Sequence, residues 1–233
     1  MSDVSCGFVG LGAMGRPMAL NLHRAGCLAA VFNRSPEKSA ALAAETGVAA
    51  ARDLAELAQR VAAVVLCVPA DDDVLAAVET LAANLAPGSF VIDCSTVAAA
   101  TAEAAAARLA SADIGFLDCP VSGGTEGARA GTLSIMVGGE AALVERARPL
   151  LEAMGKSIVH LGPAGAGQAA KATNQVMVAG INQAVTEALA FGEAHGLPMT
   201  DLIRCLSSGA AGNWFLDHRG ATMVRGEYPL GFK

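Results

Sequence analysis

The stretch Gly10-Leu11-Gly12-Ala13-Met14-Gly15 decides the fold of this chain. It has GxGxxG spacing, follows the apolar run 5–9 and opens a segment of helical character, 14–25. In such a strand–turn–helix unit the first glycine permits a tight turn, the second lets a pyrophosphate approach the backbone, and the third lets helix and strand pack closely. The helix N-terminus adds unpaired N–H groups and a partial positive charge. The stretch therefore predicts a phosphate-binding turn in a parallel α/β sheet.

The next strand-like run, 28–32, ends at Asn33-Arg34-Ser35. The carboxylate that binds the ribose of NAD in such folds is missing near Asn33. A neutral amide removes repulsion toward a 2′-phosphate, which Arg34 can bind through its planar fork with Ser35 as a further donor. These residues favour NADP over NAD as cofactor. The other interpretation is that Arg34 stacks on adenine or stays in solvent.

Strand-like and helix-like segments alternate over the first two thirds of the chain. Such alternation indicates a mostly parallel, Rossmann-type sheet with helices on both faces. The segment 132–139 follows a glycine-rich turn, so we expect it to run antiparallel at the sheet edge. The predicted strands are 5–9, 28–32, 64–68, 90–93, 115–118, 133–137 and 157–160. The predicted helices are 14–25, 36–46, 51–59, 72–84, 101–110 and 141–154.

The sequence changes character in the glycine-rich segment 162–167. Strand-like runs stop there, and residues 168 to about 193 resemble one long helix, followed by shorter helices at 199–206 and 213–224. We therefore predict two domains. Residues 1–162 form the cofactor-binding domain, and residues 163–233 form an all-α domain for substrate binding and oligomerisation.

Two loops follow predicted strands at the edge where open α/β sheets bind ligands. One contains Asp93 to Thr96, and the other runs from Asp118 to Ser122-Gly123-Gly124. The second loop can present a hydroxyl and closely spaced backbone N–H groups to a carboxylate. An ordinary glycine-rich turn is an equally good interpretation of this segment alone.

Lys171 is the most informative residue of the helical region. Lysine occurs at only four positions among the 16 Lys and Arg residues, and Lys171 lies among Ala and Thr rather than on a charged face. Asn174 and Gln175 share its helix face at i+3 and i+4. In a closed cleft such an ammonium loses its proton more easily than in water and can act as an acid or base. The alternative is a solvated lysine without a catalytic role.

Composition limits the remaining possibilities. The 233 residues are 53% hydrophobic, 16% charged and 4% aromatic, with a net charge of −6. These values argue against a disordered chain, and the acidic balance and few aromatic residues argue against nucleic-acid binding. The start resembles a strand rather than a signal peptide, and no apolar run reaches the ~20 residues of a membrane-spanning helix. We expect a soluble, cytoplasmic protein with a small-molecule partner.

The cysteine and histidine residues predict neither disulfides nor a metal site. No two of the six cysteines lie two to four residues apart, and the four histidines form no HxH or HExxH pattern. We therefore expect buried, reduced thiols and a metal-free protein.

Taken in order, the motifs resemble those of the β-hydroxyacid dehydrogenases and, more distantly, 6-phosphogluconate dehydrogenase. The resemblance covers essentially the whole chain. It rests on GFVGLGAMGRPMALNL at 7–22, DCSTV at 93–97, DCPVSGGTEGARAGTLSIMVGG at 118–139 and GAGQAAKATNQ at 165–175.

The resemblance implies a role for each matching position. Lys171 corresponds to the catalytic lysine, and Ser122, Gly123 and Gly124 correspond to the cradle for the substrate carboxylate. The other implied contacts are Thr96 with nicotinamide and substrate, Asn174 and Gln175 with substrate, and Val68, Pro69 and Asp73 with cofactor.

The implied reaction is hydride transfer between C4 of the nicotinamide and the carbinol carbon of a short β-hydroxy acid. The pattern KxxNQ, with 215–217 and 229–232, is most similar to the tartronate semialdehyde (2-hydroxy-3-oxopropionate) reductases. The alternatives are a 3-hydroxyisobutyrate or L-serine dehydrogenase and a glyoxylate or succinic semialdehyde reductase. A non-catalytic binding module is a remote alternative.

Members of the family usually assemble through the helical domain, so we expect a homodimer or homotetramer. They also continue beyond the point where this chain stops, to a KDL motif whose lysine reaches the cofactor. Lys233 lies too early to be that lysine. We therefore expect the helical domain to be incomplete, through truncation or as a shortened variant.

Overall fold

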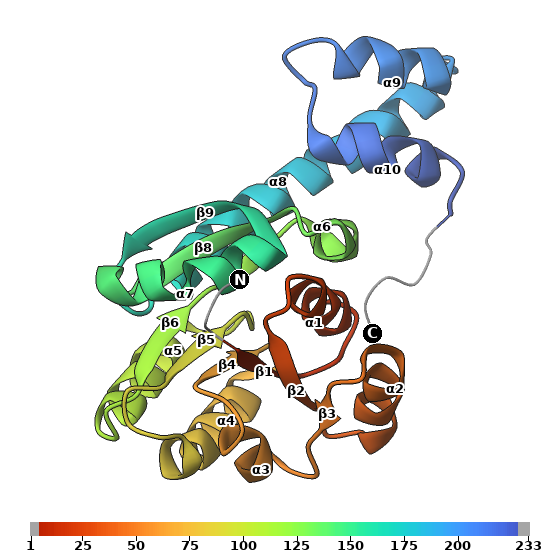
Figure 1. Ribbon diagram of the computed structural model, residues 1–233. Coiled ribbons are helices and arrows are strands. Elements are labelled where there is room, and N and C mark those ends of the chain that lie inside the picture. Colours follow the sequence, from red (N-terminus) through yellow and green to blue (C-terminus); the bar gives the residue numbers. More distant parts are fainter. Residues whose placement is uncertain (1–4, 228–233) are drawn as a thin grey trace. The chain divides into compact units, whose positions relative to one another are not determined.

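The computed structural model describes residues 5–227. Contacts divide the chain after Lys171 into two compact units, 1–171 and 172–233. Figure 1 labels the helices and strands of both units.

The first unit is built on a nine-stranded sheet whose order is β3-β2-β1-β4-β5-β6-β8-β7, with β9 paired to β8. The pairs among β1 to β6 are all parallel, and their order is that of dinucleotide-binding sheets. The strands are β1 Cys6–Val9, β2 Leu28–Phe32, β3 Ala49–Ala50, β4 Ala63–Leu66, β5 Phe90–Asp93, β6 Gly115–Asp118, β7 Val121–Ser122, β8 Leu133–Gly139 and β9 Gly155–Gly162. The predicted Rossmann-type fold class is confirmed.

Helices cover both faces of this sheet because successive strand residues point to opposite sides. Phe8, Val65 and Ile92 pack in one core with α1 Gly15–Arg24, α2 Pro36–Thr46 and α7 Ala141–Met154. Their neighbours Val64 and Val91 pack in a second core with α3 Leu54–Ala58, α4 Asp71–Asn84 and α5 Ala99–Ala110. Both faces are therefore apolar, which is why the strands form continuous hydrophobic runs.

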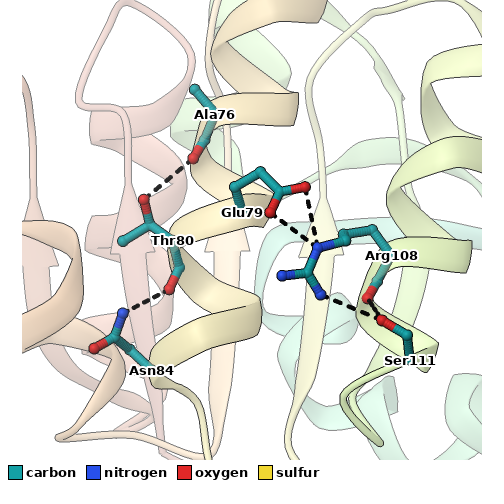
Figure 2. A network of polar contacts seen from close by, with 6 residues as sticks. All are labelled: Ala76, Glu79, Thr80, Asn84, Arg108 and Ser111. Carbon is teal, nitrogen blue, oxygen red and sulfur yellow. Dashed lines mark hydrogen bonds and ion pairs between the residues drawn. The ribbon is translucent and has the colours of Figure 1, made fainter.

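Helices α4 and α5 are also joined by a polar network at the surface (Figure 2). Nε of Arg108 donates to both carboxylate oxygens of Glu79, at 3.0 and 2.9 Å. Arg108 Nη1 lies 3.2 Å from the hydroxyl of Ser111, which donates back to the Arg108 carbonyl. This network adds a directional contact to the apolar packing between the two helices.

The glycine turn between β1 and α1 leaves no room for larger residues. A Cβ on Gly10, where φ is +94°, would lie 2.1 Å from the carbonyl oxygen of Cys67. A Cβ on Gly15 would lie 1.8 Å from the carbonyl oxygen of Gly10. Two of the three motif glycines are therefore required by close backbone packing alone.

The far end of the sheet departs from the sequence prediction. Strand β8 is antiparallel to β6 and β7, as expected. Its predicted edge position is wrong, because β9 pairs parallel with its other side. The short strands β3 and β7 and the helix α6 Gly124–Ala130 were also not predicted.

The long helix α8, Ala166–Ala194, begins in the first unit and continues into the second. The second unit adds α9 Met199–Ser207 and α10 Trp214–Val224, which pack around Val185, Leu189 and Leu216. The side chain of Asn213 accepts the Leu216 N–H at 3.0 Å, so it caps the start of α10. All three helices lie where the sequence predicted them.

The six cysteines are all free thiols. Cys6, Cys27, Cys94 and Cys119 are buried and Cys67 is half-buried, whereas Cys205 is exposed, so the expectation of burial is wrong there. Burial raises the pKa of the Cys67 thiol to about 12, which keeps it protonated at neutral pH. Over residues 5–227, no helix has both the length and the apolarity to cross a membrane, and no three His, Cys, Asp or Glu residues are grouped to hold a metal ion.

Candidate active site

The glycine turn fits the pyrophosphate of a dinucleotide. No side chain caps the start of α1, so none competes with a phosphate there, although the Arg16 N–H is already bonded to the Gly12 carbonyl oxygen at 3.1 Å. A Cβ on Gly12 would meet nothing within 4 Å, so the backbone faces open space at this point. The Asn33 amide oxygen accepts the Leu11 N–H at 2.8 Å, which ties the end of β2 to the turn. These residues can therefore hold the phosphates of NAD or NADP.

Arginines surround the outer side of this turn. A cavity of about 460 Å³ is bordered by Gly12 and Ala13 together with Arg16, Arg24 and Arg129. Arg16 is ion-paired with Glu45, whereas Arg24 and Arg129 add positive charge beside the turn in an otherwise acidic chain. The electrostatic surroundings of the turn thus also suit a phosphate.

Arg34 lies beyond β2, with its side chain 85% exposed. Its Nη1 is 3.3 Å from a carboxylate oxygen of Asp73, in the first turn of α4. Ser35 directly precedes α2, and its carbonyl accepts from the Asn33 amide at 3.2 Å. The structure thus places Asn33, Arg34 and Ser35, the residues predicted for the 2′-phosphate, at the end of β2, and it pairs Arg34 with the carboxylate of Asp73, which was predicted to contact the cofactor.

The loops after β4 and β5 are held together by Ser95. Its hydroxyl accepts the Val68 N–H at 2.9 Å, beside Pro69, and its own N–H donates to Asp93 Oδ1 at 2.9 Å. Thr96, the next residue, is exposed. Ser95 is therefore the buried support that fixes the loop from which Thr96 projects.

Gln168 connects this loop to the first turn of α8. Its side chain is 2% exposed, donates to the Ser95 carbonyl at 2.9 Å and accepts the Val97 N–H at 3.2 Å. Neither Ser95 nor Gln168 was predicted from the sequence to have a role. The available signal was a single amide between two small residues, Gly167 and Ala169, at the start of the predicted long helix.

Asp93 carries a buried carboxyl at the end of β5. Its Oδ2 has no hydrogen-bond partner within the described part of the chain. Burial raises the pKa of this carboxyl to about 6, with further contributions from the charges of Asp118 and Asp71. Asp118 is its register partner on β6.

The predicted carboxylate cradle lies where β7 ends and α6 begins. Ser122 is the last residue of β7, and Gly123 and Gly124 have φ values of +126° and +61°. Such backbone angles favour glycine, and they turn the chain directly into α6. The segment predicted as a loop is therefore a strand end followed by a short helix.

Lys171 lies beside this turn in the first unit. Its Nζ donates to the carbonyl oxygen of Val121 at 2.8 Å, next to Ser122. The side chain is half-buried, and desolvation lowers the pKa of its amine below the usual value. The structure thus joins the predicted catalytic lysine to the predicted substrate loop, although they are about 50 residues apart in sequence.

The remaining predicted residues belong to the second unit. Asn174 and Gln175 follow Lys171 on α8, and the Asn174 amide donates to Gln175 Oε1 at 3.0 Å. The segment 229–232 and Lys233 lie outside the described residues.

A larger cavity, of about 680 Å³, opens at the amino ends of β5 and β6. It is lined by residues such as Ser89, Gly115 and Arg146, and by none of the predicted site residues. Because ligands of open parallel sheets bind at the carboxyl ends of the strands, this cavity is not the active site.

Two family models cover almost the whole chain. Residues 5–162 match the NAD binding domain of 6-phosphogluconate dehydrogenase. Residues 165–233 match the NAD-binding domain of NADP-dependent 3-hydroxyisobutyrate dehydrogenase.

Individual relatives agree with these matches. The chain is 43% identical to NAD-dependent L-serine dehydrogenase of Pseudomonas aeruginosa over 213 residues, 90% of this chain and 71% of the relative. It is 36% identical to 2-hydroxy-3-oxopropionate reductase of Escherichia coli, covering 97% of this chain and 78% of the relative. A solved structure of Mycobacterium tuberculosis 3-hydroxyisobutyrate dehydrogenase with L-serine superposes with a TM-score of 0.84 at 37% identity, covering 93% of this chain and 74% of that one. The chain therefore belongs to the β-hydroxyacid dehydrogenase family of NAD(P)-dependent oxidoreductases.

Proposed function

We propose that the protein interconverts a short β-hydroxy acid and its semialdehyde, with Lys171 as the acid–base group. The contact between Lys171 Nζ and Val121, beside Ser122, is the observation that carries this proposal. The nicotinamide supplies or accepts the hydride at the carbinol carbon when it is bound. In reduction the Lys171 ammonium donates a proton to the developing alkoxide, and in oxidation the neutral amine removes it.

The named relatives define the chemistry that the site must recognise. L-Serine, 3-hydroxyisobutyrate and the reduced form of 2-hydroxy-3-oxopropionate all carry a carboxylate at C1 and a hydroxyl at C3. They differ at C2, which bears an ammonium, a methyl or a hydroxyl group. Ser122, Gly123 and Gly124 would hold the shared carboxylate, which leaves the C3 oxygen to Lys171. We place Thr96, Asn174 and Gln175 at the substrate and Val68 and Pro69 at the cofactor.

We favour 2-hydroxy-3-oxopropionate as the substrate, because Lys171, Asn174, Gln175 and the segment 215–217 resemble the corresponding residues of 2-hydroxy-3-oxopropionate reductases. L-Serine is the second candidate, because the L-serine dehydrogenase relative has the higher identity, 43% against 36%. We further propose that residues 1–162 bind the cofactor and 163–233 serve substrate binding and assembly, in a cytoplasmic homodimer or homotetramer.

A panel assay tests the activity. Reduction of 2-hydroxy-3-oxopropionate, succinic semialdehyde and glyoxylate, and oxidation of 3-hydroxyisobutyrate and L-serine, are followed at 340 nm with both cofactors. We expect the highest kcat/KM with 2-hydroxy-3-oxopropionate. Higher kcat/KM with L-serine would select the second candidate, and absence of turnover on the whole panel would refute both.

For the cofactor we propose a preference for NADP, supported by the neutral Asn33 and the exposed Arg34. Removing the guanidinium in Arg34→Ala should raise KM for NADPH roughly 10-fold, as expected for loss of a charge-assisted phosphate contact, and leave KM for NADH unchanged. Asp73→Asn should lower KM for NADPH, because Asp73 competes with the 2′-phosphate for Arg34. Arg60→Ala, at an exposed arginine paired with Glu56, is the matched control. Equal effects of Arg34→Ala on both cofactors would contradict the preference.

A further inference from the structure

Asp118 fixes the beginning of α8 from a distant strand. Its carboxylate is fully buried at the end of β6. Oδ1 accepts the Gly165 N–H and Oδ2 accepts the Gln168 N–H, each at 2.8 Å. Both N–H groups lie at the start of α8, where backbone donors have no partner within the helix. The negative charge is also favourable at this end of the helix dipole.

The same segment of chain holds the Lys171 side chain. Val121 follows Asp118 by three residues, and its carbonyl oxygen accepts from Lys171 Nζ at 2.8 Å. Lys171 in turn follows Gln168 by one helical turn. One short segment, 118–121, therefore fixes both the backbone of the first α8 turn and the position of the amine.

Two glycines make room for the Asp118 carboxylate, because a side chain at either position would collide with it. A Cβ on Gly138 would lie 2.3 Å from Asp118 Oδ1. A Cβ on Gly167 would lie 2.6 Å from the Asp118 carbonyl oxygen and 2.8 Å from Oδ2. Helix α8 thus approaches β6 and β8 as closely as backbone allows, with the carboxylate as the polar contact between them.

We infer that Asp118 is a positioning residue for the reaction, acting through the first turn of α8 to set Lys171 Nζ against Val121 and the adjoining substrate turn. This inference rests on the proposed acid–base role of Lys171. Asp118 itself touches no reacting atom. An amide at this position keeps the shape but can accept only one of the two N–H groups and turns an NH₂ toward the other.

Kinetics of Asp118→Asn, alone and combined with Lys171→Ala, test the inference on the full chain. Displacing a catalytic group by about 1 Å can cost roughly 100-fold, so kcat in Asp118→Asn should fall roughly 10- to 100-fold. The dissociation constant of the cofactor should stay within about 2-fold, because the glycine turn is untouched. In the Lys171→Ala background the second substitution should change the residual kcat by less than about 2-fold, since its effect passes through the missing amine.

Asp53→Asn is the matched control, since Asp53 also accepts a backbone N–H at a helix start, that of Glu56 at 2.8 Å. It should leave kcat unchanged. If Asp118→Asn lowered kcat by the same factor in the Lys171→Ala protein as in the unsubstituted protein, its effect would be a general structural one. That result would overturn the inference. A change in kcat below about 3-fold in Asp118→Asn would also overturn it. If Asp118→Asn does not fold by circular dichroism, Asp118→Ser, which keeps one cap acceptor, replaces it in the same cycle.

Competitive acetylation with mass spectrometry separates failure of this inference from failure of the proposed function. Asp118→Asn should change the pH dependence of Lys171 labelling and leave Lys38 and Lys156 unchanged, whether or not any substrate turns over. Unchanged labelling of Lys171 would refute the positioning role. Absence of turnover in the unsubstituted protein, with altered labelling in the variant, would refute the proposed function alone.

Discussion

At the scale of single residues, Asp93 makes folding depend on pH. Its carboxyl has a pKa of about 6 in the folded chain, raised from 3.8 chiefly by burial. Between these values the native state binds the extra proton, so this group's contribution to the free energy of unfolding falls as pH rises. The shift corresponds to a destabilisation of roughly 3 kcal/mol when Asp93 is ionised.

Asp93→Asn removes this titration and keeps an acceptor for the Ser95 N–H. The unfolding free energy of the variant minus that of the unsubstituted protein should increase by up to about 3 kcal/mol from pH 4 to pH 7.5. Urea unfolding at both pH values measures the difference, with the exposed Asp72→Asn as control. A stability difference that is the same at both pH values would contradict the assignment.

Residues with a local signal could be predicted from the sequence, whereas residues whose role depends on distant partners could not. The glycine turn was recognisable from spacing, and Lys171 from its unusual surroundings. The support by Asp118 and Gln168 was not, because their partners lie 47 to 73 residues away. Only the register of β5 with β6 brings Asp93 next to Asp118.

At the scale of elements, apolar packing rather than the surface ion pair should hold α4 to the sheet and to α5. Leu81 is fully buried in the core beneath α4, so Leu81→Ala should cost roughly 2–5 kcal/mol. The Glu79–Arg108 pair is exposed, and a double-mutant cycle with Glu79→Gln and Arg108→Gln should give a coupling of at most about 1 kcal/mol. Thermal unfolding measures both, and a coupling as large as the Leu81 effect would contradict this ranking.

Helices and strands were predicted correctly where long apolar or Ala-rich runs are buried. They were missed where tertiary contacts override a weak local preference for helix or strand. Strands β2, β5 and β6 and helices α2 and α7 have the predicted bounds. Helix α6 contains Gly124 and Gly127, which disfavour helix, yet its Gly127 and Ala128 are buried and it contacts α1. Strand β4 ends at Leu66 rather than 68. The Cys67 N–H still bonds to the Val9 carbonyl oxygen, but the Val68 N–H is taken by the Ser95 hydroxyl instead of a neighbouring strand.

At the scale of the whole molecule, the division after Lys171 leaves the predicted cofactor turn, the two loops of the candidate site and Lys171 in one compact unit. The glycine turn, the Ser95 loop, the Ser122 turn and the lysine all belong to residues 1–171. The first turns of α8 are bonded to Asp118 and Ser95, which explains why the lysine belongs with the sheet rather than with the following helices. The groups to which we assign cofactor binding and proton transfer in the proposed reaction therefore belong to a single folded unit.

Single-turnover reduction by the Lys171→Ala protein tests the central claim most directly. The cofactor and 2-hydroxy-3-oxopropionate are mixed with excess enzyme, and the absorbance change at 340 nm gives the rate of hydride transfer. Loss of the acid–base group should slow this rate roughly 10²- to 10⁴-fold. Cofactor affinity should remain unchanged, and the exposed Lys156→Ala should react at the normal rate. A near-normal rate in Lys171→Ala would contradict the account.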